Sequence, residues 1–302
     1  MKALLLVNPA SGREKVNKLV KVAKRKFEEK KYHLDVYFSK CAGDLTEKAL
    51  KWAGDYDTYI VCGGDGTINE VVNGVMQSDV RPNIAVMPVG TVNDISHILG
   101  MSRNIGKNLD VIFNNKPIPT DINKINDHYF VYVSGAGYLT EVSYEADRLE
   151  KKKYGSLAYL KTGIKGLKKK PFFTAKIECN GEVYIEQVSL LLILSANQFG
   201  GMRLPFFAPQ GKLNDSLVDI RVFSGRNIWL IFRLVMFILL LGRKQYKQYH
   251  VATSKATITP LDTDNVKWNA DGELVATGKI KLEVIPSAIN FYVNPKRVKK
   301  LY

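Results

Sequence analysis

The residues best suited to chemistry form one short stretch, Gly63-Gly64-Asp65-Gly66-Thr67-Ile68-Asn69-Glu70. A β-branched and aromatic run over 58–62 precedes it and predicts a buried strand, and apolar residues typical of a helix follow it. The glycines should therefore lie on a turn from a strand into a helix. Glycine allows close approach of the backbone to a ligand, and the first amides of a helix bind anions. The stretch predicts a phosphate site.

Asp65 adds a constraint to this interpretation. A carboxylate inside a phosphate loop is unfavourable unless a cation accompanies the phosphate, and a nucleotide bound with Mg²⁺ supplies one. The alternative is a tight turn in which Asp65 only caps the helix. Three glycines, an Asp and a Thr exceed what a turn needs, so we favour the nucleotide. The spacing matches neither a P-loop nor a dinucleotide fingerprint.

The elements that must position this loop alternate between strand and helix. Strands are expected over 3–7, 34–38, 58–62 and 84–87, and helices over 16–27 and 45–52. This alternation predicts an α/β domain with a doubly wound parallel sheet. In such sheets ligands bind at the carboxyl ends of the strands. The segments 8–12 and 90–94, Ser39 and the glycine loop all fall there.

The pattern changes after Asp121. Strand-like runs without intervening helices cover 129–134, 172–178, 188–196, 217–223, 251–259 and 279–285. They predict a second domain that is mainly antiparallel, a β-sandwich, with the boundary near Lys124. Two helical segments interrupt the strands, a basic one over 138–170 and an apolar one over 227–242. The apolar segment is interpreted either as a core helix or as a partly exposed surface that meets lipid beside lysines. The basic run 165–170 is either a solvated face or a membrane-facing patch.

Charge and composition limit the partners. The chain has 302 residues and a net charge of +15, which favours an anionic partner such as a nucleotide or an anionic membrane surface. We expect no nucleic-acid partner, because no binding signature occurs. Three scattered cysteines argue against disulfides and a zinc site. The apolar part of the N-terminal segment is too short for a signal peptide, and the apolar run 228–241 is too short for a membrane span. We expect a cytoplasmic protein associated peripherally with the inner face of the membrane.

Three motifs together resemble a known family. The turn Asn8-Pro9-Ala10-Ser11-Gly12, the glycine loop and the segment Gly90-Thr91-Val92-Asn93-Asp94 are similar to the pattern of the diacylglycerol kinase catalytic domain. Sphingosine, ceramide and bacterial lipid kinases share it, and NAD kinases carry a shorter relative of the loop. The resemblance covers nearly the whole chain. It implies a nucleotide-binding kinase domain over 1–124 to which 290–302 returns, and a β-rich lipid-substrate domain over 125–289.

The resemblance also implies the ligands of the first domain. An ATP site would be lined by Asn8, Pro9, Ala10, Ser11, Gly12, Ser39, Gly64, Asp65, Gly66, Thr67, Ile68, Asn69, Glu70 and Thr91. Asp65, Asp94 and Asp121 would hold Mg²⁺ and ordered water near the phosphates. From the residues alone, Asp94 could instead be a helix N-cap and Asp121 a strand-end residue.

Two motifs of the second domain have two interpretations each. Asn269-Ala270-Asp271-Gly272-Glu273 first suggests a hairpin turn, whereas the resemblance makes Glu273 the catalytic base. The segment 212–217 reads as a surface turn. The resemblance implies a structural Mg²⁺ there, held by the carbonyls of Lys212 and Leu217 and by the side chain of Asp215.

The function that we infer from the resemblance is transfer of the γ-phosphate of ATP to a lipid hydroxyl. Diacylglycerol is the first expectation, with phosphatidic acid as product. One alternative is a soluble NAD kinase-like enzyme that uses Asp65 as base, and another is a non-catalytic nucleotide- or membrane-binding module. The sequence leaves open the lipid and the oligomeric state, a homodimer among the options.

Overall fold

The computed structural model describes residues 1–11, 13–137, 173–199, 202–203, 207–208, 211–225, 228–240, 242 and 248–302. The chain divides into two compact units, 1–122 with 286–302, and 123–285. The strands β5 (Ile118–Ile125) and β18 (Ile280–Phe291) each continue from one unit into the other. Gly12 and the basic helical segment expected over 138–170 lie outside the described residues.

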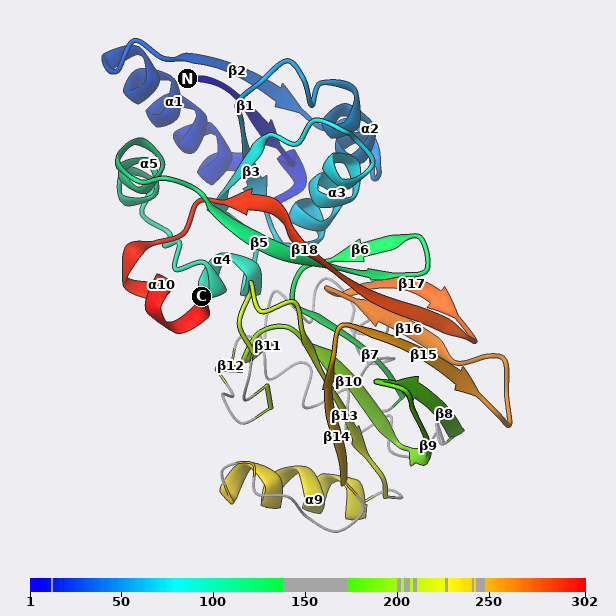
Figure 1. Cartoon of the computed structure of the whole chain (residues 1–302). Coiled ribbons are helices and arrows are strands. Elements are labelled where there is room, and N and C mark those ends of the chain that lie inside the picture. Colours follow the sequence, from blue (N-terminus) through cyan, green and yellow to red (C-terminus); the bar gives the residue numbers. More distant parts are fainter. Residues whose placement is uncertain are drawn as a thin grey trace. The chain divides into compact units, whose positions relative to one another are not determined.

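The first unit contains the predicted parallel sheet (Figure 1). Its strands lie in the order β2-β1-β3-β4, and the end of β18 pairs with β4 in parallel. Val7 lies opposite both Phe38 and Cys62, and Gly63 lies opposite Pro88. The strands therefore end side by side, and the loops that follow them start at one edge. The strand bounds are β1 (Lys2–Val7), β2 (His33–Phe38), β3 (Thr58–Gly63) and β4 (Asn83–Pro88).

Helices cover both faces of this sheet, α1 and α5 on one and α2 and α3 on the other (Figure 1). The helical spacing of α1 is confirmed, because Val16, Leu19, Ala23 and Phe27 are buried. Phe27 meets Phe113 of α5 edge-on, with 5.1 Å between ring centroids. The bounds are η1 (Pro9–Ser11), α1 (Arg13–Glu29), α2 (Asp44–Lys51), α3 (Asp65–Met76), α4 (Asp94–Ile98), α5 (Ile105–Asn114) and α10 (Pro295–Leu301).

The second unit is a sandwich of two antiparallel sheets. One contains the start of β18 with β15 (Lys255–Pro260), β8 (Phe173–Cys179) and β9 (Glu182–Val188). The other has the order β14-β13-β10-β7-β16-β17. A core that includes Trp268, Ile177 and Ile193 fills the space between them. The remaining bounds are β6 (His128–Phe130), β7 (Val133–Gly137), β10 (Leu190–Leu194), β11 (Gln198–Phe199), β12 (Met202–Arg203), β13 (Val218–Phe223), β14 (Gln248–Thr253), β16 (Lys267–Ala270) and β17 (Glu273–Thr277).

Two of the strand predictions were wrong, because each of these runs forms two separate strands in the structure. The run 129–134 breaks between β6 and β7 because the carboxylate of Asp271 binds the backbone N–H groups of residues 131–133. The run 251–259 breaks after Thr253, whose hydroxyl bonds both the N–H and the carbonyl of Lys255. Strands β14 and β15 consequently belong to different sheets.

Helix α9 (Ile228–Leu239) has one face buried, as expected of a core helix, and apolar residues exposed on another. Leu230 and Phe237 are buried in a cluster with Phe207 and Phe223. Phe232 and Leu239 belong to another face, where 54% and 67% of each residue is exposed. Within the residues that the structure describes, no helix has the length and apolar character to cross a membrane.

The contact between α2 and α3 depends on Gly74. A Cβ at this position would lie 2.2 Å from the backbone oxygen of Thr46. Gly74→Ala should gain about 1 kcal/mol of helix propensity but lose more through overpacking against the backbone, about 1–3 kcal/mol. We expect a lower free energy of unfolding, measured by urea denaturation.

Gly54→Ala is the matched control, because no atom lies within 4 Å of its added Cβ. If the two variants were equally stable, helices α2 and α3 could move apart at Gly74 at little cost in free energy.

Candidate active site

The glycine loop joins β3 directly to α3. Gly63 ends the strand, Gly64 is the N-cap in an extended conformation (φ −97°, ψ −172°), and Asp65 begins the helix. The first amides of a helix have no acceptor within the helix, and the dipole makes this end partly positive. The loop therefore presents the backbone groups that a phosphate needs.

The loops after β3 and β4 touch through their glycines. A Cβ on Gly90 would lie 2.7 Å from the Cα of Gly64, and one on Gly63 would lie 2.3 Å from Thr67. The N–H of Val89 also donates to the carbonyl of Gly63 (3.3 Å). No other residue type fits Gly63 or Gly90 without moving its neighbours.

The loop after β1 joins the same edge through Asn8. Its side-chain amide donates to the hydroxyl of Thr67 (3.0 Å), and its N–H donates to the carbonyl of Cys62 (3.0 Å). Its side-chain oxygen accepts from the N–H of Ala10 (3.0 Å), which holds the η1 turn. The N–H of Ser39 donates to the carbonyl of Val7 (2.8 Å). Loops from three neighbouring strands thus connect to one another.

Asp65 caps a helix other than its own. Its carboxylate accepts from the N–H groups of Asp94 (3.1 Å) and Ile95 (3.0 Å), the first two residues of α4. A carboxylate has about four acceptor positions, so these two bonds do not by themselves exhaust it. Asp65 therefore does bind the first N–H groups of a helix, as the capping interpretation expected. That helix is α4, whereas the interpretation had expected α3.

Asp94 and Asp121 are both buried. Asp94 is not the N-cap of α4, because Asn93 takes that position with φ 57°. Asp121 lies inside β5 rather than at its end, and its carboxylate accepts from the N–H of Ser287 (2.8 Å). Among the described residues, no three His, Cys, Asp or Glu side chains gather as a metal site. A metal here would need ligands beyond the protein carboxylates.

The other predicted ATP residues lie on or beside these loops. Ile68 is fully buried, and Asn69 is buried and accepts a bond from the amide of Asn73 (2.9 Å). Gly66 and Glu70 are in the first turns of α3, and Thr91 is exposed before α4. Burial raises the pKa of the Cys62 thiol to about 12, so it stays protonated and is no nucleophile.

The Asp-Gly-Glu motif forms the predicted hairpin turn in the second unit. Asp271 and Gly272 both have positive φ (48° and 98°) between β16 and β17. The carboxylate of Asp271 accepts from the N–H groups of Val131 (2.6 Å), Tyr132 (3.2 Å) and Val133 (3.2 Å). Glu273 is exposed at the start of β17. Sequence reasoning missed the role of Asp271, whose sequence position gives no sign of its distant partners.

The candidate ion loop is also in the second unit. Lys212 is exposed, and the carboxylate of Asp215 accepts from the N–H of Leu217 (3.1 Å). Ser216 between them has φ 61°. The side chain of Asp215 thus turns back onto the backbone of Leu217, and these are two of the three predicted ligands.

Comparison with known proteins agrees with this architecture. Residues 2–125 match the family model of the diacylglycerol kinase catalytic domain. A diacylglycerol kinase of Bacillus subtilis strain 168 is 34% identical, over 90% of this chain and 89% of its own length. The chain belongs to the diacylglycerol kinase family. It is therefore an ATP-dependent kinase of a lipid kinase family.

Further relatives agree with this assignment. A diacylglycerol kinase of Staphylococcus carnosus strain TM300 is 33% identical, over 75% of this chain and 74% of its own length. A crystal structure of a proposed diacylglycerol kinase from Bacillus anthracis strain Sterne has a TM-score of 0.81 at 26% identity and covers 98% of both chains. These matches favour a lipid kinase over the NAD kinase-like enzyme and the non-catalytic module.

The cap that Asp65 provides makes a prediction about the stability of this kinase. Asp65→Ala removes the acceptor of two N–H groups of α4. The loss of a helix cap should lower the free energy of unfolding by about 1–2 kcal/mol, measured by urea denaturation. Asp79→Ala removes the same charge from an exposed position and should change stability by less than about 0.5 kcal/mol. Equal effects would contradict the capping role.

The hairpin gives a second stability prediction. Asp271→Asn keeps the shape but replaces one acceptor oxygen by a donor beside N–H groups, which should cost about 1.5–3 kcal/mol. Glu273→Gln, two residues away and exposed, should leave the melting temperature nearly unchanged. If both variants had the melting temperature of the parent chain, the three hydrogen bonds to Asp271 would not stabilise the hairpin.

Proposed function

We propose that this kinase transfers the γ-phosphate of ATP to the hydroxyl of diacylglycerol, with phosphatidic acid as the product. The observation that supports it best is the edge where Gly64, Gly90 and Asn8 hold three loops together at the N-terminus of α3. Phosphoryl transfer depends on positioning and on charge neutralisation, and this edge supplies positioned donors. The unit 1–122 with 286–302 would be the nucleotide-binding domain, and 123–285 the lipid-substrate domain.

The first amides of α3 would hold the phosphates of ATP, with the loops at 8–12 and 90–94 around them. Asn8 would fix the position of Thr67 through their hydrogen bond. Asp65 would hold α4, and with it the segment 90–94, in a fixed place. The glycines would allow the phosphates to approach the backbone without a side chain in between.

The residues fit a Mg²⁺ ion that arrives with ATP. Mg²⁺ is usually held by one or two carboxylates together with substrate phosphates and water. Asp65 is half-buried at the loop, and Asp94 follows it in the hydrogen-bond network. When bound, the ion would neutralise phosphate charge. Asp121 would hold ordered water near the phosphates, while its carboxylate also binds the N–H of Ser287.

Glu273 would be the general base. The hydroxyl oxygen of the lipid forms a bond to the γ-phosphorus, the bond from phosphorus to ADP breaks, and the hydroxyl proton passes to the Glu273 carboxylate. An exposed carboxylate on a turn fixed by three hydrogen bonds suits this task, because its position does not depend on a flexible loop.

The turn 212–217 would hold a structural Mg²⁺ through the carbonyls of Lys212 and Leu217 and the carboxylate of Asp215. Hard cations prefer such oxygen ligands. The bond from the Leu217 N–H already turns Asp215 back over this segment, which supports the proposal.

The kinase would work as a peripheral enzyme at an anionic membrane surface, at the inner face where ATP is present. The stripe of exposed apolar residues on α9 (Phe232, Val235 and Leu239) has the spacing of one helix face and would enter the lipid. The net charge of +15 would add attraction to anionic headgroups.

The proposed base is tested by Glu273→Gln. This change keeps the side-chain shape and removes the proton acceptor, so turnover with diacylglycerol in mixed micelles should fall roughly 10²–10⁴-fold. ATP affinity, measured by calorimetry, should stay nearly constant. If the variant kept its turnover, Glu273 would not be the base and would only begin a hairpin strand. If ATP binding were lost together with turnover, Glu273 would be a nucleotide-binding or structural residue.

The proposed membrane contact is tested by the double change Phe232→Ser and Leu239→Ser. Loss of these two exposed apolar side chains should weaken binding to vesicles of phosphatidylcholine and phosphatidylglycerol about tenfold or more in sedimentation. Ile185→Ser is the control, because Ile185 is equally exposed on β9. If the Ile185→Ser variant bound vesicles as weakly as the α9 variant, helix α9 would not be the membrane contact.

A further inference from the structure

Asp44 is the first residue of α2 and is buried, although residues 40–43 before it are exposed. Its carboxylate accepts from the backbone N–H of Lys40 (2.8 Å) and, through both oxygens, from the hydroxyl of Tyr37 (2.9 and 3.1 Å). These bonds lead back to β2 and to the loop 39–43 between β2 and α2. Asp44 therefore holds this loop, although it belongs to the helix that follows.

The bonds to Asp44 are charge-assisted. Burial alone would raise the pKa of Asp44, but the bonds from Lys40 and Tyr37 lower it, and the pKa lies below its ordinary value. The carboxylate is therefore ionised at neutral pH, and hydrogen bonds to an ionised acceptor are the stronger ones. The ring of Tyr37 is itself fixed, because it meets Trp52 edge-on with 5.0 Å between ring centroids.

Helix α2 ties this loop to the helix of the glycine loop. The hydroxyl of Thr46 donates to the carbonyl of Glu70 in α3 (3.0 Å), and the backbone of Thr46 lies against Gly74. The two helices lie side by side (Figure 1). Through Asp44 the loop 39–43 thus has a fixed place relative to α3, whose first amides would hold the phosphates of ATP.

The spacing of the strands indicates which part of ATP this loop meets. Phe38 and Cys62 both lie opposite Val7, on the two sides of β1. Neighbouring strands are about 4.8 Å apart, so the loop after β2 begins about 10 Å from the glycine loop. Phosphates at the N-terminus of α3 are out of its reach, whereas the ribose and base of the same nucleotide extend far enough to meet it.

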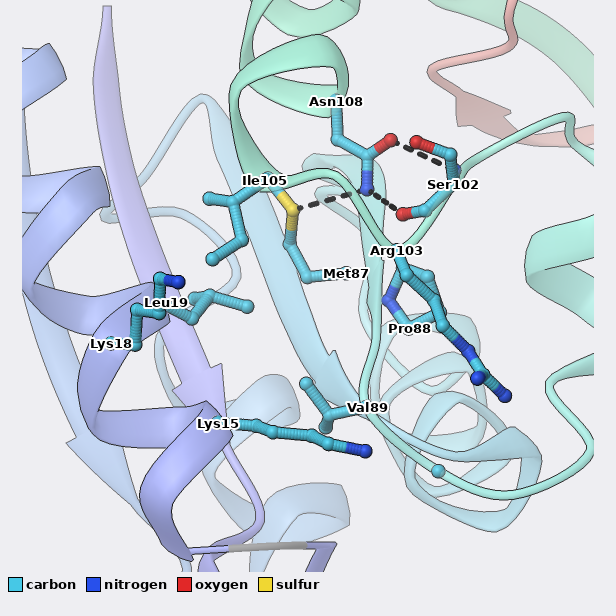
Figure 2. Close-up of a pocket in the computed structure, with 11 residues that line it drawn as sticks. Lys15, Lys18, Leu19, Met87, Pro88, Val89, Ser102, Arg103, Ile105 and Asn108 are labelled. Carbon is cyan, nitrogen blue, oxygen red and sulfur yellow. Dashed lines mark hydrogen bonds between the residues drawn. The ribbon is translucent and has the colours of Figure 1, made fainter.

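A cavity of about 220 Å³ beside α1 is the competing place for the ribose and base (Figure 2). Leu19 of α1 forms one wall, and Met87 at the end of β4 and Ile105 at the start of α5 form others. Helices α1 and α5 cover one face of the sheet, and α2 and α3 cover the other. The cavity belongs to the face opposite α3, whereas the loop 39–43 leads to α2 on the face of α3, which favours the loop.

We propose that Asp44 is a positioning residue for ATP, which holds the loop 39–43 against the nucleoside end of the nucleotide. This inference rests on the proposed function, in which the phosphates lie at the N-terminus of α3. Asp44 acts through the backbone of the loop and does not itself touch the nucleotide. An ordered loop binds the nucleoside more tightly, because the cost of ordering it is met before ATP arrives.

Calorimetry of the full chain with a non-hydrolysable ATP analogue and with inorganic tripolyphosphate, both with Mg²⁺, tests this role. Asp44→Ala should raise the Kd of the analogue about tenfold, because the loop must then be ordered on binding. The Kd of tripolyphosphate should not change, since tripolyphosphate lacks the nucleoside. A general loss of structure would weaken both ligands. Asp35→Ala is the matched control, because Asp35 also accepts from a tyrosine hydroxyl (Tyr56, 2.8 Å) but lies nearer the amino end of β2.

Tyr37→Phe is a second variant that keeps the ring against Trp52 and removes only the hydroxyl. It should raise the Kd of the analogue roughly threefold and leave that of tripolyphosphate unchanged. Tyr56→Phe, which removes the hydroxyl that binds Asp35, should bind both ligands as wild type does. This pair carries the test if Asp44→Ala does not fold.

The inference is overturned if the variants of Asp44 and Tyr37 bind the analogue as wild type does, if they weaken both ligands by the same factor, or if the control variants weaken the analogue equally. It is also overturned if Ile105→Trp, which fills the cavity, weakens the analogue alone, because the nucleoside end then lies in the cavity. All these readouts are binding. A chain that binds the analogue through Asp44 but does not phosphorylate diacylglycerol would refute the proposed function and leave this inference standing.

Discussion

The first unit depends on the contact between two backbones at the carboxyl edge of its sheet. Gly64 and Gly90 approach so closely that a single methyl group on Gly90 would collide with the opposite Cα. This contact brings the loops after β3 and β4 together, and the bond from Asn8 to Thr67 adds the loop after β1. The N-terminus of α3 therefore opens onto a surface made of backbone, which suits phosphates better than a surface of side chains.

Carboxylates do structural work in both units by binding backbone N–H groups. Asp65 caps α4, Asp121 holds Ser287, and Asp271 holds three successive residues at 131–133. Such bonds fix segments far apart in the sequence without extended side-chain packing. Under the proposed function these motif residues would have a chemical task as well as this structural one, so a loss of activity after their substitution separates into chemistry and folding only when stability is measured as well.

Much of the fold was predictable because its signals are local. The alternation of apolar runs and helical spacing placed the sheet of the first unit, and the glycine motif placed its loop. The failures came from distant partners. The broken strand at 129–134 depends on Asp271, more than a hundred residues away, and the capping of α4 depends on Asp65 in another loop. The cavity beside α1 was not predictable either, because helix α1, the end of β4 and the segment before α5 come together only through tertiary packing.

The central claim is that the glycine-loop edge carries ATP for transfer to a lipid. The most direct measurement is incubation of the purified chain with γ-labelled ATP, Mg²⁺, NAD and diacylglycerol in mixed micelles, followed by separation of lipid and aqueous products. The account predicts label in phosphatidic acid, dependent on added diacylglycerol. Label in the phosphorylated dinucleotide, or in inorganic phosphate alone, would contradict it.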